Sequence, residues 1–264
     1  MSVPATVMKR PGLEAIAAKG WLRAWKWLLL RRASQLGFLA LFLVGPWFGW
    51  WIVKGTLASS LTLGILPLTD PYTLLQSLAA RHWPEVTALL GALIVLAVYL
   101  VVGGRVYCSW VCPMNLVTDA ALWLRRRLGL GIGAHLRRET RYAILVASLA
   151  VSALAGVVAW ELVNPVTILH RGLLFGIGFG WALIAAIFLF DLLIARHGWC
   201  GHLCPVGAFY GLLGKVGPLK VVARRRSQCN DCMDCFNVCP EPQVITPALK
   251  GDRKGLGPVI TDSA

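Results

Sequence analysis

The sequence predicts an all-α integral membrane protein with four transmembrane helices. Hydrophobic residues make up 57% of the 264 residues and charged residues only 14%, whereas soluble domains carry about a quarter charged residues. Four stretches without a charged residue are each long enough to cross a bilayer, which takes about 20 apolar residues. These predicted spans are residues 33–53, 86–104, 142–160 and 172–190.

The charge distribution predicts the orientation. The net charge is +14, from 26 Lys and Arg against 12 Asp and Glu. Seven Lys and Arg precede the first span, seven follow the second and nine follow the fourth, whereas the opposite side holds only Lys54, Arg81 and Arg171. Because Lys and Arg collect on the cytoplasmic side of membrane proteins, both termini are expected in the cytoplasm. The positive charge is then mainly a topology signal, which argues against nucleic-acid binding.

The spans divide the chain into four parts. Residues 1–32 are a basic segment in which Trp and Leu alternate with Lys and Arg, as in a helix that lies on the inner membrane surface. The membrane domain is expected at 33–195, a basic linker at 196–226 and a separate tail segment at 227–264. The glycine-rich start of the fourth span favours close helix packing over nucleotide binding, because no strand precedes it.

The most specific motif is a run of four cysteines in the tail. Cys229, Cys232, Cys235 and Cys239 precede Pro240 with the spacing C-x₂-C-x₂-C-x₃-C-P of bacterial ferredoxins. A tight loop directs three thiolates to three corners of one cubane cluster, and the fourth usually binds a different cluster. A Cys₄ zinc site would need two cysteine pairs separated by a longer loop. We therefore expect at least one 4Fe–4S cluster in the cytoplasmic tail.

Two further cysteine pairs repeat one pattern at the inner ends of the second and fourth spans. A loop at 108–113 contains Cys108 and Cys112, and a second loop contains Cys200 and Cys204. Each pair has the spacing C-x₃-C-P and follows an aromatic residue. If the loops meet, the four thiols form a second redox or metal site, with a cubane, a thiophilic metal such as copper or a reversible disulfide as the occupant. The alternative is four reduced thiols packed inside the loops.

Other cofactors are not expected. The sequence lacks the C-x-x-C-H motif of covalently attached haem. None of its five His lies inside a predicted span, so paired axial ligands for a membrane haem are missing. No P-loop occurs, so a nucleotide cofactor is not expected either.

Taken together, these motifs resemble the NapH family of ferredoxin-type membrane proteins, which are encoded with periplasmic nitrate reductases. The stretches GRVYCSWVCPMNLVTDA and CNDCMDCFNVCPEPQVI carry the resemblance, which covers nearly the whole chain. The resemblance implies a quinol dehydrogenase component of the bacterial inner membrane. Its implied partners are the quinol pool, an iron–sulfur protein of the NapG type and a membrane multihaem cytochrome, with the electrons passing towards the nitrate reductase.

The tail departs from the pattern of that family. NapH-type tails carry two ferredoxin runs and hence two clusters, whereas this sequence shows one run before Ala264. We expect either a C-terminal truncation or ligands supplied by a partner or by the loop cysteines.

Quinol oxidation releases protons, so the resemblance also calls for a proton acceptor at the membrane edge. Ionisable residues near a membrane are functional candidates. Glu161 lies at the end of the third span and His170 just before the fourth, both on the predicted outer side. An imidazole accepts a proton near neutral pH. The alternative is that both are solvated loop residues.

A second function class stays open beside electron transfer. Paired cysteine loops at a membrane surface also suit a metal-handling or maturation factor. A third class is a scaffold that recruits soluble redox partners through its basic surface.

Overall fold

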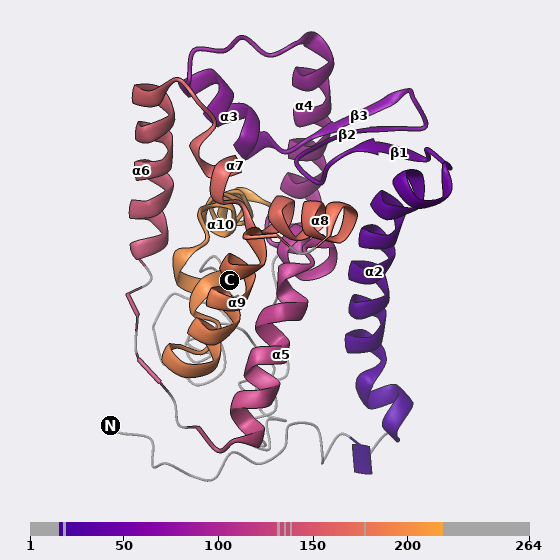
Figure 1. Ribbon diagram of the computed structural model, residues 1–264, viewed down its shortest axis with the longest axis vertical. Coiled ribbons are helices and arrows are strands. Elements are labelled where there is room, and N and C mark those ends of the chain that lie inside the picture. Colours follow the sequence, from indigo (N-terminus) through magenta and orange to yellow (C-terminus); the bar gives the residue numbers. More distant parts are fainter. Residues whose placement is uncertain are drawn as a thin grey trace.

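The computed structural model describes residues 16–17, 20–130, 133–134, 136–137, 139–176 and 178–218. The described chain is mostly helical, which confirms this part of the predicted fold class (Figure 1). The predicted tail segment at 227–264 lies outside the described residues, together with its cysteines Cys229, Cys232, Cys235 and Cys239.

The helices and π-helical turns of the described chain are, in order, α2 (Trp21–Phe48), α3 (Pro71–Ala79), α4 (Val86–Val102), η1 (Tyr107–Val111), α5 (Met114–Arg127), α6 (Thr140–Ala155), α7 (Ala159–Val163), α8 (Pro165–Phe175), α9 (Gly180–Leu189), η2 (Phe190–Ile194), η3 (Trp199–Leu203) and α10 (Pro205–Val216). Helices α4 and α5 run one after the other down the molecule, with the first cysteine loop between them (Figure 1).

A small β-sheet corrects the all-α expectation. Strands β1 (Val53–Gly55), β2 (Ser59–Thr62) and β3 (Leu66–Thr69) form an antiparallel sheet in the order β1-β2-β3. The sheet packs on α4, where a side chain at Gly91 would come within 3.0 Å of the backbone of Pro67. The sequence did not reveal these strands, because short apolar runs are ambiguous between helix and strand.

Helix α2 joins two segments that the sequence analysis separates. It runs without interruption from the basic segment through most of the first predicted span. The helix ends at Gly49, whose φ of 78° is left-handed and whose N–H donates to the carbonyl of Gly45. Of the described helices, α2 is long and apolar enough to cross a membrane, and 86–102, 140–155 and 180–194 are shorter apolar helices.

The fourth predicted span is not one helix. The chain leaves α8 at Gly176, whose φ is 92°, and α9 begins at Gly180. The glycines that flank this break let the two helices approach closely. A Cβ at Gly172 would lie 2.6 Å from the indole nitrogen of Trp181, and one at Gly180 would lie 2.7 Å from Ile168. The expected close helix packing is therefore present, but between α8 and α9 within the predicted span.

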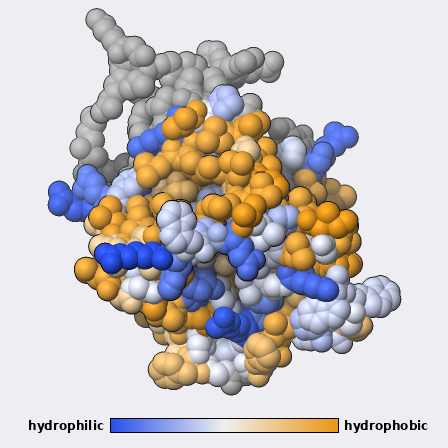
Figure 2. All heavy atoms as spheres, turned by 90° about the horizontal axis from the view of Figure 1, so that it is seen from above, coloured by the Kyte–Doolittle hydropathy of each residue, from blue (hydrophilic) through white to orange (hydrophobic). Residues whose placement is uncertain are grey.

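The exterior of the described chain is rich in large apolar side chains. Trp83 is 92% exposed, Leu154 88% and Ile65 84%. Figure 2 shows hydrophobic residues over much of the face seen from above, interrupted by smaller hydrophilic patches. Soluble monomers rarely expose apolar surface of this extent, and a lipid-facing protein does.

Candidate functional site

The two cysteine loops fold into the same local structure. In each loop the amide of the second cysteine donates to the carbonyl of the aromatic residue five positions earlier. The distance is 3.0 Å from Cys112 to Tyr107 and 2.9 Å from Cys204 to Trp199. The second cysteine is extended in both, with φ, ψ of −65°, 118° at Cys112 and −71°, 115° at Cys204. Single π-turns of this kind occur frequently at functional sites.

The proline after each second cysteine begins the next helix. Pro205 is the first residue of α10, and Pro113 directly precedes α5. Proline suits the first turn, because the N–H that it lacks has no partner inside the helix. Each loop is thus a π-turn followed at once by an α-helix, and the second cysteine stands at the junction.

The four loop cysteines line one cavity. Cys108 and Cys112 reach it from the first loop and Cys200 and Cys204 from the second, and all four are free. The cavity has an empty volume of about 690 Å³, part of which opens to the surroundings. The remaining wall is mostly apolar and aromatic, and Asp70, Asn115 and Asn164 contribute polar groups. The tertiary structure thus brings together two motifs that lie 92 positions apart in the sequence.

The thiols in this cavity need a cation to become thiolates. Burial raises the pKa of all four, and that of Cys112 reaches about 12. The backbone amides of Met114 and Asn115 lower the pKa of Cys112 by less than burial raises it, and Arg105 has the same limited effect on Cys108. Without a metal these thiols are protonated at neutral pH, and binding of a metal would displace the protons.

The number and the chemistry of the thiols suit an iron–sulfur cluster. In the part of the chain that the structure describes, no three His, Cys, Asp or Glu side chains gather closely enough to hold one metal ion. The four cysteines nevertheless line one cavity, and burial together with neighbouring thiols raises the pKa of Cys108 and Cys200. Ligands of a cubane surround four irons instead of one and stand further apart. The soft donors, their number and the apolar wall therefore fit an iron–sulfur cluster.

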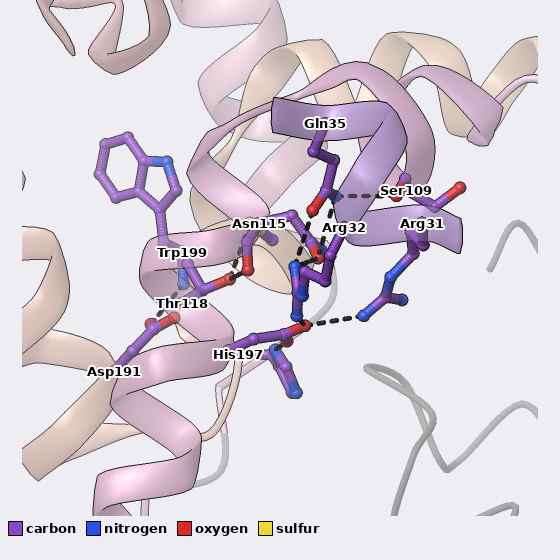
Figure 3. A network of polar contacts seen from close by, with 11 residues as sticks. Arg31, Arg32, Gln35, Ser109, Asn115, Thr118, Asp191, His197 and Trp199 are labelled. Atoms are coloured by element: carbon purple, nitrogen blue, oxygen red, sulfur yellow. Dashed lines mark hydrogen bonds and ion pairs between the residues drawn. The ribbon is translucent and has the colours of Figure 1, made fainter. Parts of the chain in front are cut away.

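Side chains of helix α2 hydrogen-bond to the backbone of the first cysteine loop. The amide of Gln35 donates to the carbonyl of Ser109 at 2.8 Å, and the hydroxyl of Ser34 donates to the carbonyl of Trp110 at 2.9 Å. Both carbonyls belong to η1, between Cys108 and Cys112. Figure 3 shows Gln35 reaching from α2 toward Ser109. The sequence analysis missed these residues, because it treated this part of the chain as a basic lead and a membrane span.

A cluster of charges lies beside this contact. The carboxylate of Asp119 on α5 accepts from Arg31 at 2.7 Å and also from Arg32 (Figure 3). Arg32 donates further to Gln35 at 2.7 Å and to Asn115 at 3.3 Å. These two arginines, which the sequence analysis counted only as topology signals, therefore link α2 to α5.

His197 contacts the same carboxylate from the second cysteine loop region. Its Nδ1 lies 3.9 Å from Asp119, and its φ of 50° is left-handed. Burial lowers the pKa of His197 to about 4, so the ring is neutral at physiological pH and adds no ion pair. His197 is thus a neutral member of the polar cluster around Asp119.

Asp191 positions the start of the second cysteine loop. The buried carboxylate accepts from the backbone N–H of Trp199 at 3.0 Å, directly before Cys200 (Figure 3). Arg125 donates to the carbonyls of Asp191 and Leu192 at 3.3 and 2.9 Å. The two loops are therefore fixed by different side chains, although their backbones match.

The two predicted proton acceptors lie in different surroundings. Glu161 accepts from Thr167 at 2.6 Å and from Asn164 at 3.0 Å, and Asn164 lines the thiol cavity. His170 is 3% exposed and packs edge-on against Phe42 of α2, with ring centroids 6.0 Å apart. Burial lowers its pKa. Glu161 is thus one hydrogen bond from the cavity, whereas His170 is not among the described residues that line it.

These features define a class of protein. A mostly helical chain with an apolar exterior gathers four partly buried cysteines around one cavity, as a membrane-associated iron–sulfur protein would. Comparison with known families agrees, because a 4Fe–4S binding domain matches residues 85–131 and 176–226. Each matched segment contains one cysteine loop, so the match repeats along the chain in the same way as the motif.

The chain belongs to the family of ferredoxin-type proteins that includes NapH and MauN. It is 56% identical over 243 residues to the methylamine utilization ferredoxin-type protein MauN of Methylorubrum extorquens, covering 92% of this chain and 85% of that protein. It is 53% identical over 234 residues to the ferredoxin-type protein NapH of Escherichia coli, covering 89% and 82%. These matches support an electron-transfer role. No solved structure matches the chain significantly.

Proposed function

We propose that the protein oxidises quinol in the bacterial inner membrane and passes the electrons through iron–sulfur clusters towards a periplasmic nitrate reductase. The observation that carries the proposal is the convergence of four partly buried cysteines from two matched loops on one cavity. NapH relatives and the 4Fe–4S domain match support it. The proposed partners are the quinol pool, an iron–sulfur protein of the NapG type and a membrane multihaem cytochrome.

Cys108, Cys112, Cys200 and Cys204 would hold a 4Fe–4S cluster, which supplies one-electron redox chemistry when bound. The mostly apolar wall limits contact with water, and burial is one of the factors by which a protein sets a cluster potential. Four soft thiols on one cavity match the four thiolate ligands of a cubane, which favours this proposal over the metal-handling alternative. Copper bound to purified protein and lost in the double variant Cys112→Ser, Cys204→Ser would favour the alternative instead.

The tail run is proposed to hold a further 4Fe–4S cluster on Cys229, Cys232 and Cys235, with Cys239 on the same or a neighbouring cluster. Anaerobically purified protein is expected to be brown and to show a cubane EPR signal on reduction. Serine at Cys232 should remove part of the bound iron. Zinc in place of iron in anaerobic metal analysis would contradict this assignment.

Glu161 and His170 are the proposed proton acceptors for quinol. A reduced quinol added to the anaerobic protein is expected to produce a reduced-cluster EPR signal. Glu161→Gln should slow this reduction by about 100-fold, within the range that a positioned acid–base group contributes. Glu139→Gln, on the exposed side chain at the start of α6, should leave the rate unchanged. An unaltered rate in both Glu161→Gln and His170→Gln would contradict the role of these residues.

Four transmembrane segments with both termini in the cytoplasm are proposed as the topology. Helix α2 begins and α5 ends at the lower end of the molecule, whereas the α3–α4 connection lies at the upper end (Figure 1). Reporter fusions after Lys54 and Arg171 are expected to be periplasmic, and a fusion after Arg127 cytoplasmic. The reverse pattern would contradict this topology.

The relatives point to two different terminal electron acceptors. MauN proteins, named for methylamine utilization, are as similar to this chain as NapH proteins are. Deletion of the gene should impair growth on nitrate if the NapH role is correct. A defect confined to growth on methylamine would assign the protein to the second system.

A further inference from the structure

A threonine hydroxyl on α5 contacts a sulfur of the second cysteine loop. The thiol of Cys200 donates to the hydroxyl oxygen of Thr118 at 3.9 Å, across 82 positions of sequence. Thr118 is fully buried, and Cys200 lines the thiol cavity. The contact therefore joins the helix that follows the first loop directly to a proposed cluster ligand in the second loop.

The position of Thr118 is fixed, but its hydroxyl hydrogen is not. Helix α5 contacts η3, the turn that contains Cys200. The hydroxyl of Thr118 donates to the carbonyl of Asn115, one turn earlier in α5, at 3.3 Å. A hydroxyl has one donor hydrogen that rotates to suit its surroundings. The hydrogen can therefore turn from this carbonyl to another acceptor without a movement of the helix.

Binding of a cluster would reverse the direction of the bond between Thr118 and Cys200. A cysteine that binds a metal has lost its proton, so its sulfur can no longer donate to the hydroxyl oxygen. The sulfur is then an acceptor. The hydroxyl carries the hydrogen that remains between the two atoms, and it becomes the donor.

The thiolate of Cys200 lacks the support that backbone amides give to the second cysteine of each loop. Burial, the other loop thiols and the carboxylate of Asp191 raise the pKa of Cys200. Burial also raises the pKa of Cys112 and Cys204, but backbone N–H groups at the start of the next helix oppose that rise. A hydrogen bond from Thr118 would give Cys200 a comparable donor.

We propose that the hydroxyl of Thr118 donates a hydrogen bond to the Cys200 sulfur of the loop cluster, and that this bond raises the reduction potential of the cluster. The inference rests on the proposed function of the four loop cysteines. Reduction adds one electron to the cluster and makes its sulfurs more negative, so a hydrogen bond to sulfur is stronger in the reduced form. Hydrogen bonds to the sulfurs are among the factors that set cluster potentials. Loss of the hydroxyl therefore lowers the potential.

The test compares Thr118→Val with Thr118→Ser in the full-length protein, purified anaerobically. Valine keeps the branched shape and removes the hydroxyl, whereas serine keeps the hydroxyl and removes only the methyl group. The EPR signal of the loop site is first identified as the one that disappears in the variant Cys112→Ser, Cys204→Ser. Thr118→Val is expected to keep the bound iron and to lower the reduction potential of that signal. Thr118→Ser should leave the potential close to that of the unaltered protein.

A second measurement detects the bond itself. After long exchange into deuterium oxide, pulsed EPR of the reduced loop signal is expected to show a deuteron coupling that Thr118→Val lacks and Thr118→Ser retains. Thr118→Ala removes the same hydroxyl, and it replaces the valine variant in both measurements if that variant loses its iron.

Three results would overturn the inference and leave the four-cysteine site intact. They are an unchanged potential in Thr118→Val, a deuteron coupling that this variant retains, and a potential that falls as far in Thr118→Ser as in Thr118→Val. The last result would assign the effect to the methyl group. If the double cysteine variant loses no EPR signal, the proposed function of the loops fails instead, so the two failures are distinguishable.

Discussion

Serine in place of any one of the four loop cysteines is expected to abolish the loop cluster. Cys108, Cys112, Cys200 and Cys204 line one cavity, and serine replaces the soft thiolate with a hydroxyl that binds iron poorly. Residues that act as a unit are strongly non-additive. Cys112→Ser should therefore impair quinol-dependent electron transfer about as much as Cys112→Ser combined with Cys204→Ser. Iron content, EPR and the rate of quinol oxidation report the result.

The control for this series lies between two of the cysteines. The hydroxyl of Ser109 donates only to backbone carbonyls within the same turn, those of Arg105 and Val106, and the residue does not line the cavity. Ser109→Ala should therefore keep both the iron and the activity. Additive, partial losses from the single serine variants would show that the two loops act independently, and retention of full iron content would show that the thiols do not bind it.

Asp119→Asn is expected to destabilise the protein and to loosen the first cysteine loop. The variant leaves Arg31 and Arg32 without their carboxylate in a site where all three side chains are only about one-fifth exposed. Breaking a buried ion pair by removing one partner costs several kcal/mol, and this partly exposed one should cost about 2–3 kcal/mol. That loss corresponds to a fall of about 5–10 °C in the melting temperature of a domain of this size.

The second effect of Asp119→Asn reaches the cysteines through α2. Arg32 also donates to Gln35, and Gln35 holds the carbonyl of Ser109 inside the first loop. Iron occupancy of the loop site should therefore fall together with the melting temperature. Glu139→Gln is the matched control, because its 3.8 Å pair with Arg137 is almost fully exposed and exposed pairs contribute little. Equal melting temperatures and iron contents for the two variants would contradict the role of α2 as the support of the loop.

The sequence by itself determined the features that depend on residues close together in the chain. The repeated C-x₃-C-P spacing with a preceding aromatic residue marks both cysteine loops, and the domain match repeats over the same two segments. The apolar runs locate α4, α9, most of α6 and the second half of α2, since hydrophobic composition is a local property. Glycines in the fourth span indicate close packing. A local pattern could not reveal that Gly176 ends α8 in a left-handed conformation, because apolar composition continues across the break.

The tertiary structure decided what distant residues do to one another. From the sequence, Arg31 and Arg32 are interpreted as topology signals. Only the fold shows that they donate to Asp119, which is 88 and 87 positions away. The sheet at 53–69 likewise depends on packing against α4, and the four loop cysteines share a site only once the cavity is formed. The physical reason is that spacing along the chain fixes which side chains share a turn. Burial and charge pairing depend on which segments pack together.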